Sequence, residues 1–180
     1  MIYFIFLIFH DQNSIIKLQI DVRRVFMGVG YGFKCKKCGY YYDVHLGVGM
    51  MFPRVYDSCI NDIKAGKYGK EWRKIALSQE YIAVDASKYL YICKSCNHWK
   101  VSYSLSLYKP KDIDSIQNKQ YTSYVTPSML EYEYTFIKSY IHKCDKCSKR
   151  MCRYDINSQS SLVCPKCGTD NEVSELIRWD

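Results

Sequence analysis

Four cysteine pairs of the form Cys-x-x-Cys constrain this chain of 180 residues more than any other feature of its sequence. The pairs are Cys35/Cys38, Cys93/Cys96, Cys144/Cys147 and Cys164/Cys167. Two thiolates on one tight turn converge on a single ion, and two such turns complete the tetrahedron of four sulfurs that a structural zinc ion takes. The eight cysteines therefore predict metal binding, with two Zn²⁺ ions per chain.

The spacing of the pairs suggests how they combine. Cys147 and Cys164 are separated by 16 residues, which falls within the spacing of known zinc sites. Cys38 and Cys93 are separated by 54 residues, which a helical insertion accommodates. We expect the first pair to share an ion with the second, and the third with the fourth, because sequential elements are usually spatial neighbours. An alternative in which the first and last pairs share one metal stays open.

Two of the pairs carry a family resemblance. The segments 35–43 (CKKCGYYYD) and 164–168 (CPKCG) resemble the knuckles of zinc-ribbon and rubredoxin-like proteins, and the first is particularly similar to the first knuckle of rubredoxin. The resemblance implies that the glycine after the second cysteine takes the left-handed conformation. Asn97 and Ser148 stand at that position in the other two pairs; asparagine tolerates the conformation better than serine. Residues 31–108 are also similar to uncharacterised bacterial zinc-ribbon proteins, which implies no particular function.

Hydrophobic patterning predicts short strands and two helices. Aromatic and β-branched residues flank each cysteine pair, which is typical of β-hairpins around a tight turn. Val55 to Ala65 has apolar residues at helical spacing and ends at Gly66, and a shorter helix is expected around Glu71 to Leu77. Ser128 and Glu131 resemble a capping box that opens a helix through about Phe136.

The predicted fold is a small, metal-stabilised α+β protein built from two zinc-ribbon (rubredoxin-like) β-hairpin modules, with a helical insertion in the first. A module of about fifty residues needs a staple such as a structural metal, because its hydrophobic core is small. The expected segments are an N-terminal extension (1–26), module one (27–108, insertion 55–77), a polar linker (109–130) and module two (131–180).

The N-terminal extension opens with an apolar run, Met1 to Phe9. That run is too short for a membrane span, which needs roughly 20 apolar residues, and no basic region or cleavage site marks a signal peptide. A loosely attached extension, a signal-like or interfacial segment, and translation that starts at Met27 all stay open. We expect a cytoplasmic protein without membrane contact, because the cysteine pattern is typical of metal binding and not of a secreted disulfide framework.

The net charge favours an anionic partner only mildly. The chain carries a formal charge of +8, and eight thiolates binding two divalent ions reduce it to about +4. Five basic residues around the third pair form the candidate surface for DNA, RNA or a nucleic-acid-processing protein. They are Lys143, Lys146, Lys149, Arg150 and Arg153. The competing interpretation is that these cations offset the negative charge of the thiolates.

The chain is expected to be a binding protein and not an enzyme. It has no zinc-protease or hydrolase motif, and a closed four-thiolate site leaves no position where a water could be activated. We therefore predict a structural or adaptor role. A rubredoxin-like protein that transfers electrons through iron and a protein-interaction module without nucleic-acid affinity are the alternatives, since iron accepts the same four thiolates. No feature predicts an oligomeric state.

The remaining candidate ligands are expected to have other roles. Cys59 lies on the apolar face of the predicted helix and is expected to be a buried core thiol. Cys152 is expected to be a packed or free thiol. His98 and His142 adjoin cysteine pairs but are not needed as ligands, because the four pairs complete two sites. A thioredoxin-type redox pair is disfavoured, because the flanks of the pairs have strand character and do not open a helix.

Overall fold

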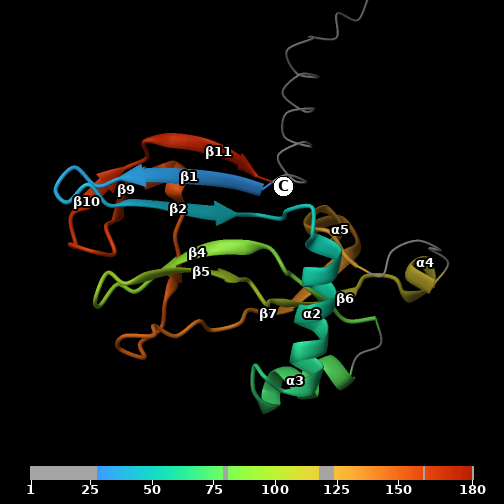
Figure 1. Ribbon diagram of the computed structural model, residues 1–180. Helices are drawn as coiled ribbons and strands as arrows, with labels where there is room; N and C mark the ends of the chain where they lie inside the picture. Colours follow the sequence, from blue (N-terminus) through green and yellow to red (C-terminus); the bar gives the residue numbers. More distant parts are fainter. Residues whose placement is uncertain (1–27, 79–80, 118–123, 160, 180) are drawn as a thin grey trace, which may run out of the picture.

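The computed structural model describes residues 28–78, 81–117, 124–159 and 161–179 (Figure 1). The expected N-terminal extension, 1–26, lies outside these residues. In chain order the elements are β1 (Gly28–Lys34), β2 (Tyr41–Leu46), α2 (Phe52–Ala65), α3 (Lys70–Ser78), β3 (Ala83–Val84), β4 (Lys88–Ile92), β5 (Trp99–Tyr103), β6 (Leu107–Pro110), α4 (Ile113–Gln117), α5 (Pro127–Glu133), β7 (Tyr134–Lys138), β8 (Cys152–Arg153), α6 (Ile156–Gln159), β9 (Ser161–Val163), β10 (Asp170–Glu172) and β11 (Glu175–Trp179).

The strands form four small antiparallel sheets, in the orders β11-β1-β2, β5-β4-β8, β3-β6-β7 and β10-β9. In three of them a strand from the last third of the chain pairs with one from the first two thirds: β11 with β1, β8 with β4, and β7 with β6. The segments expected as separate modules, 27–108 and 131–180, are thus hydrogen-bonded to each other. The result is a small α+β fold whose sheets connect distant parts of the chain.

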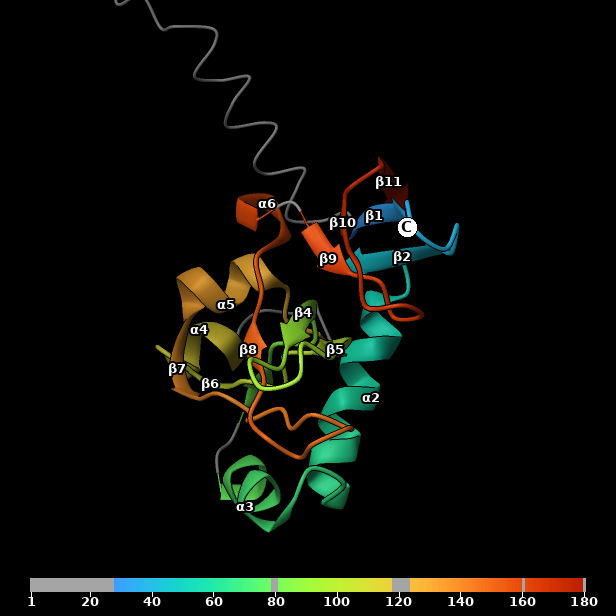
Figure 2. The ribbon, with the colours of Figure 1, turned by 90° about the vertical axis from the view of Figure 1, so that its left-hand side faces the viewer.

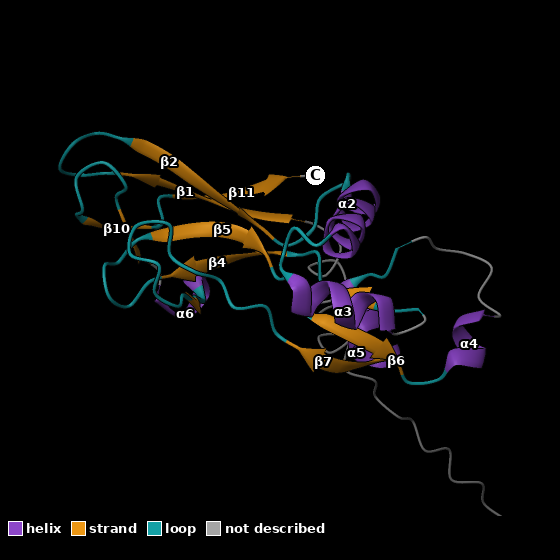
Figure 3. Ribbon diagram, turned by 90° about the horizontal axis from the view of Figure 1, so that it is seen from below, coloured by secondary structure: helices purple, strands orange, loops and turns teal. Residues whose placement is uncertain are grey.

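The helices and the hairpin turns occupy opposite ends of the molecule. In Figure 1 the helices α2, α3 and α5 lie at one end, and the turns that follow β1, β4 and β9 lie at the other. Figure 3 shows the same hairpins extending side by side away from α2, α3 and α5, while the short helix α6 lies at the hairpin end. Figure 2 looks at the molecule from the end with the turns, where the four cysteine pairs are found.

The predicted helical insertion is present as α2 and α3. Phe52, Tyr56, Cys59 and Ile63 recur every three or four residues along α2 and are all buried, so one face of this helix packs into the protein. The helix ends at Gly66, whose φ of 88° gives the left-handed turn that the sequence predicts. No helix in the described part of the chain is long and apolar enough to cross a membrane.

Three hydrophobic clusters fill the interior. The largest joins α2 and α3 to β3, β6 and α5. The second surrounds the first and last cysteine pairs, with Phe33, Leu90 and Leu162 almost completely buried. The third is small and consists of Tyr91, Met151 and two of the cysteines, Cys93 and Cys144, with partly buried neighbours. The second and third cysteine pairs therefore have little apolar core around them, whereas the first and last pairs pack against a larger one.

The segment expected as a linker contains regular structure. β6 ends within it at Pro110, α4 follows, and α5 begins before its end. The predicted cap at Ser128 is wrong: Oγ1 of Thr126 accepts the N–H of Met129 and caps the helix two residues earlier. Pro127 suits the first helical position because it has no N–H to satisfy. The helix stops at Glu133 and not near Phe136, because the chain continues as β7 and pairs with β6.

A pair of leucine substitutions tests this core. Leu107 is completely buried between β3 and β7, whereas the side chain of Leu77 on α3 is 61% exposed. We expect Leu107→Ala to lower the free energy of unfolding by about 2–5 kcal/mol, because it removes buried methyl groups and leaves a cavity. Leu77→Ala should change it by less than about 0.5 kcal/mol. Denaturant unfolding of the metal-loaded protein measures both, and equal losses of stability would contradict the burial pattern.

Candidate metal centres

The eight paired cysteines gather into two groups of four. Cys35, Cys38, Cys164 and Cys167 form one group, which we call site A, and Cys93, Cys96, Cys144 and Cys147 form the other, site B. Within each group the four sulfur atoms lie within 4.8 Å of one another, so each group could hold a metal ion.

The expected sequential pairing is therefore wrong, and the alternative in which the first and last pairs meet is the arrangement observed. The physical reason is the sheet pairing. β11 pairs with β1 and brings the last cysteine pair to the first, while β8 pairs with β4 and brings the third pair to the second. Site B is nested within site A along the chain.

The sulfur geometry matches four ligands around one ion. Cys35 Sγ lies 3.4 Å from Cys167 Sγ, and Cys38 Sγ lies 3.8 Å from Cys164 Sγ. In site B, Cys93 Sγ and Cys147 Sγ are 3.4 Å apart, and Cys96 Sγ is 3.6 Å from Cys144 Sγ. Zinc–sulfur bonds of about 2.3 Å in a tetrahedron place sulfurs about 3.8 Å apart, whereas a disulfide would require about 2.05 Å. All ten cysteines are free thiols.

The four cysteine pairs sit on four copies of the same turn. In each turn the carbonyl oxygen of the first cysteine accepts an N–H from the residue four positions later: Gly39, Asn97, Ser148 or Gly168, at 2.8–2.9 Å. The N–H of the first cysteine also donates to the carbonyl five positions later, at 2.8–2.9 Å. These two bonds fold each Cys-x-x-Cys segment so that both sulfurs point to the same side.

The residue after each second cysteine adopts the left-handed conformation that the knuckle resemblance implies. The φ angles are 68° at Gly39 and 76° at Gly168, and 54° at Asn97 and 58° at Ser148. The two turns with glycine belong to site A and the two without it belong to site B. Ser148 is the least suited to this conformation, so tertiary contacts have to maintain the turn of the third pair.

The electrostatics of the thiols favour a bound cation. The hydroxyl and N–H of Thr169 stabilise the Cys167 thiolate and lower its pKa to about 6, and the N–H of Ser95 lowers the pKa of Cys93 to about 6. The N–H of Lys149 also favours the Cys147 thiolate, but the neighbouring sulfur of Cys93 and burial raise its pKa to about 12. Ionisation of one thiol in a group therefore makes ionisation of its neighbour less favourable. A divalent cation removes this conflict, and its ligands are deprotonated.

Polar contacts that the sequence did not indicate hold the two halves of site A together. Asn171 is buried and links both turns: its Oδ1 accepts the N–H of Lys36 at 3.2 Å, and its Nδ2 donates to the carbonyl oxygen of Thr169 at 2.7 Å. The hydroxyl of Tyr42 donates to the carbonyl oxygen of Leu162 at 2.8 Å. The only sequence signal for these residues is their position within a few residues of a cysteine pair.

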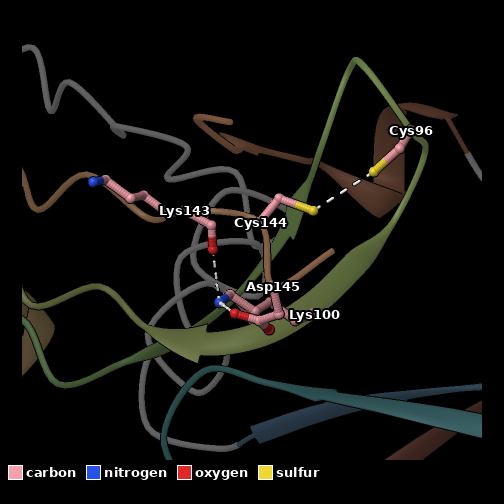
Figure 4. Close-up of polar contacts among 5 residues, drawn as sticks. All are labelled: Cys96, Lys100, Lys143, Cys144 and Asp145. Atoms are coloured by element: carbon pink, nitrogen blue, oxygen red, sulfur yellow. Dashed lines mark hydrogen bonds and ion pairs between the residues drawn. The ribbon is translucent and has the colours of Figure 1, made fainter. Parts of the chain in front are cut away.

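Site B is supported by a lysine from β5. Lys100 Nζ donates to the carbonyl oxygen of Lys143 at 2.9 Å and to Oδ1 of Asp145 at 2.7 Å (Figure 4). The hydrogen bond from Lys100 holds the pKa of Asp145 below its usual range. The ring of His142 lies against the ring of Tyr91, with 3.9 Å between ring centroids and 34° between ring planes, and burial lowers the pKa of His142.

The other candidate ligands lie outside both groups. Cys59 is buried in α2, as expected for a core thiol, and burial raises its pKa to about 11. Cys152 is half-buried on β8 opposite Ile92. Among the described residues, neither His98 nor His142 belongs to a possible metal group.

The five basic residues predicted as a nucleic-acid surface are exposed, but they do not line one common cleft. Lys146 lines a cleft of about 340 Å³ between the two sites, together with Lys166, Trp99, Cys96 and Cys164. Arg150 and Arg153 line a different cavity. Lys143 lies opposite Arg150 in an isolated β-bridge, and Lys149 belongs to the turn of the third pair.

Comparisons with known proteins find no matching family model, no matching curated protein and no matching solved structure. The two cysteine groups and their surroundings are therefore the basis for any conclusion about function.

The observed pairing predicts which cysteines become reactive together. In the variant Cys35→Ser/Cys38→Ser, we expect Cys164 and Cys167 to react with a thiol reagent while site B stays protected, because only site A loses two of its four candidate ligands. The matched variant Cys144→Ser/Cys147→Ser should expose Cys93 and Cys96 instead. Pulse alkylation followed by peptide mass mapping measures this. If Cys93 and Cys96 react in the first variant while Cys164 and Cys167 stay protected, the observed pairing is wrong and the sequential pairing is correct.

Proposed function

We propose that this chain is a zinc-binding structural protein of zinc-ribbon type that acts as an adaptor, and that its cysteine-rich end binds single-stranded nucleic acid. The observation that carries the proposal is the convergence of both four-cysteine groups on one cleft that two lysines line.

The structural part of the proposal rests on what each group connects. The members of site A are up to 132 residues apart in the chain, and those of site B up to 54. An ion in each would cross-link segments that short strands alone hold weakly. Zinc suits this role because it has no redox chemistry that would alter its bonds. Four thiolates also complete its coordination, which supports binding and not catalysis.

The nucleic-acid part rests on the chemistry of the cleft. Lys146 and Lys166 come from the turns of different sites and line the same space. Trp99 also lines it, and the Nε1–H of Trp99 donates to the carbonyl oxygen of Val163 at 2.7 Å, which fixes the ring. Beside the cleft, Tyr40 is 43% exposed, and Lys166 Nζ lies 5.9 Å from the centroid of its ring. Aromatic rings on which bases stack, next to lysines that contact phosphates, are typical of surfaces for single strands.

Electron transfer and protein interaction, the two alternative roles, each require properties that differ from those of the proposed one. Electron transfer requires iron in place of zinc, and the exposed Cys96 would then give an electron a short route to solvent. A protein-interaction module requires no salt-dependent affinity for nucleic acid, with the lysines serving only to offset the thiolates. Metal content and salt dependence separate the three.

Metal analysis tests the structural role. Protein purified without added metal should contain two zinc ions per chain and be colourless, by elemental analysis and visible absorbance. Removing zinc with a chelator at neutral pH should lower the stability of the cysteine-rich end, most of all around site B, where the apolar cluster is small. Re-addition of zinc should restore it. A red sample with iron that bleaches on reduction would favour electron transfer, and a folded metal-free protein would refute the structural role.

A charge-matched pair of variants tests the nucleic-acid role. Lys146→Gln/Lys166→Gln should weaken binding to random single-stranded DNA or RNA. The plot of log K against log salt should become less steep, by about 0.7 for each phosphate that the protein no longer neutralises. Lys64→Gln/Lys74→Gln removes the same charge from exposed positions on α2 and α3 at the opposite end, and it should leave the slope unchanged. Fluorescence anisotropy over a salt series measures both, and absence of binding by the unmodified protein at low salt would refute this role.

A further inference from the structure

A second cavity, of about 280 Å³, lies apart from the cleft between the metal sites, and its lining includes three serines and two arginines. Its walls come from β4, the connection between β5 and β6, the segment 139–141 that follows β7, and the segment around β8. None of this lining contributes a ligand to site A or site B. The cavity is therefore a separate feature of the fold.

Two buried serines open onto this cavity. Ser104 and Ser106 are each only 7% exposed, and their Oγ atoms are 2.9 Å apart. Ser104 also hydrogen-bonds the side chain of Tyr91, which lines the same cavity. Three hydroxyl groups joined by two hydrogen bonds retain one proton to donate, and they line a space that a ligand could occupy.

The backbone between the serines is held in a strained conformation. Leu105 has a φ of 56°, which residues with a side chain rarely adopt, and its side chain is buried in the largest core cluster. Its carbonyl oxygen accepts the Nε1–H of Trp72 at 2.8 Å, and its N–H donates to the carbonyl oxygen of Asp85 at 2.9 Å. These contacts fix the turn. Strain that the surrounding structure maintains in this way is concentrated at functional sites.

Two arginines give the cavity a positive charge. Arg150 and Arg153 both line it, and among the described lining residues none is acidic. The guanidinium carbon of Arg153 lies 3.4 Å from the centroid of the Tyr89 ring, which lines a neighbouring cavity together with Arg153, so Arg153 is shared between the two spaces and Arg150 is the cation of this one. The buried carboxylate of Asp85 accepts the N–H of Ser87 at 3.0 Å through Oδ1, and after burial its negative charge is the main cause that raises the pKa of Tyr91 in the lining, so it offsets part of this positive charge. Guanidinium groups match the oxygens of a phosphate better than any other side chain.

We propose that this cavity binds the phosphate group of a phosphate monoester, with Arg150 contacting the phosphate oxygens, Arg153 adding positive charge, and the hydroxyl network of Ser104, Ser106 and Tyr91 donating one hydrogen bond to it. The volume exceeds that of a bare phosphate, and the rings of Tyr91 and Tyr140 in the lining can contact the rest of the ligand. The proposal does not depend on the nucleic-acid role, because the lysines of that role line the other cleft.

Titration of the full-length, zinc-loaded protein with inorganic phosphate and with adenosine 5′-monophosphate tests the proposal. Calorimetry gives the affinity, and the amide signals of 104–106 and the side-chain signals of both arginines should shift in NMR spectra. Arg150→Gln should weaken binding about tenfold or more, and Ser104→Ala/Ser106→Ala severalfold, since charged donors contribute more than neutral ones. Lys149→Gln is the control: it removes the same charge nearby from a residue outside the lining, and should change affinity less than about twofold.

Two further measurements distinguish the source of the phosphate. If a 5′-phosphorylated oligonucleotide binds more tightly than its 5′-hydroxyl counterpart, and Arg150→Gln removes that gain, the ligand is a nucleic-acid end. If only the small phosphates depend on Arg150, the ligand is a free metabolite. Absence of saturable binding to any of these probes, or equal losses of affinity from Arg150→Gln and Lys149→Gln in variants with unchanged NMR spectra, would overturn the proposal.

Discussion

The repulsion among four thiolates at one point is the constraint on which the rest of this structure depends. In each site the pKa of one thiol is lowered and that of another is raised, so four ionised sulfurs at 3.4–3.8 Å require a cation between them. The sites tie the beginning of the chain to its end and its middle to its last third. If an ion in such a site acts as a disulfide does, the cross-link lowers the conformational entropy of the unfolded chain. For a loop of this length, that raises the free energy of unfolding by about 4–5 kcal/mol.

The size of the sheets explains why such cross-links are needed. β3 and β8 have 2 residues each, and β9 and β10 have 3. Ladders this short are marginal in water. The largest hydrophobic cluster lies at the helical end, and a second cluster, with Phe33, Leu90 and Leu162, surrounds site A. The cluster at site B is small, and hydrogen bonds such as those of Lys100 connect the chain there. Site B is therefore the part of the molecule that would gain most from a bound ion.

Local features were predictable from sequence, whereas the pairing of the sites was not. Periodicity identifies α2, and Gly66 gives its end, because helix signals lie within a few residues of the structure that they determine. The turns likewise follow from Cys-x-x-Cys and the residue after it. Which turns meet depends on the pairing of β1 with β11, and β11 has no sequence signal for its partner. One hint was present: the two turns with glycine share site A, and those with Asn97 and Ser148 share site B. Sequence order proved the weaker guide, since each site joins like turns and not adjacent ones.

The nested arrangement also determines where binding chemistry can develop. Site B lies within the loop that site A closes, and the turns that carry both sites lie at one end of the molecule (Figure 2). Cys96 of site B and Cys164 of site A line the cleft between them. The arginine-lined cavity adjoins site B through the turn that leads to Arg150 and β8. We therefore expect disruption of site A to disturb the cleft more than the cavity, and disruption of site B to disturb both, because each cysteine group positions the turns that line these spaces.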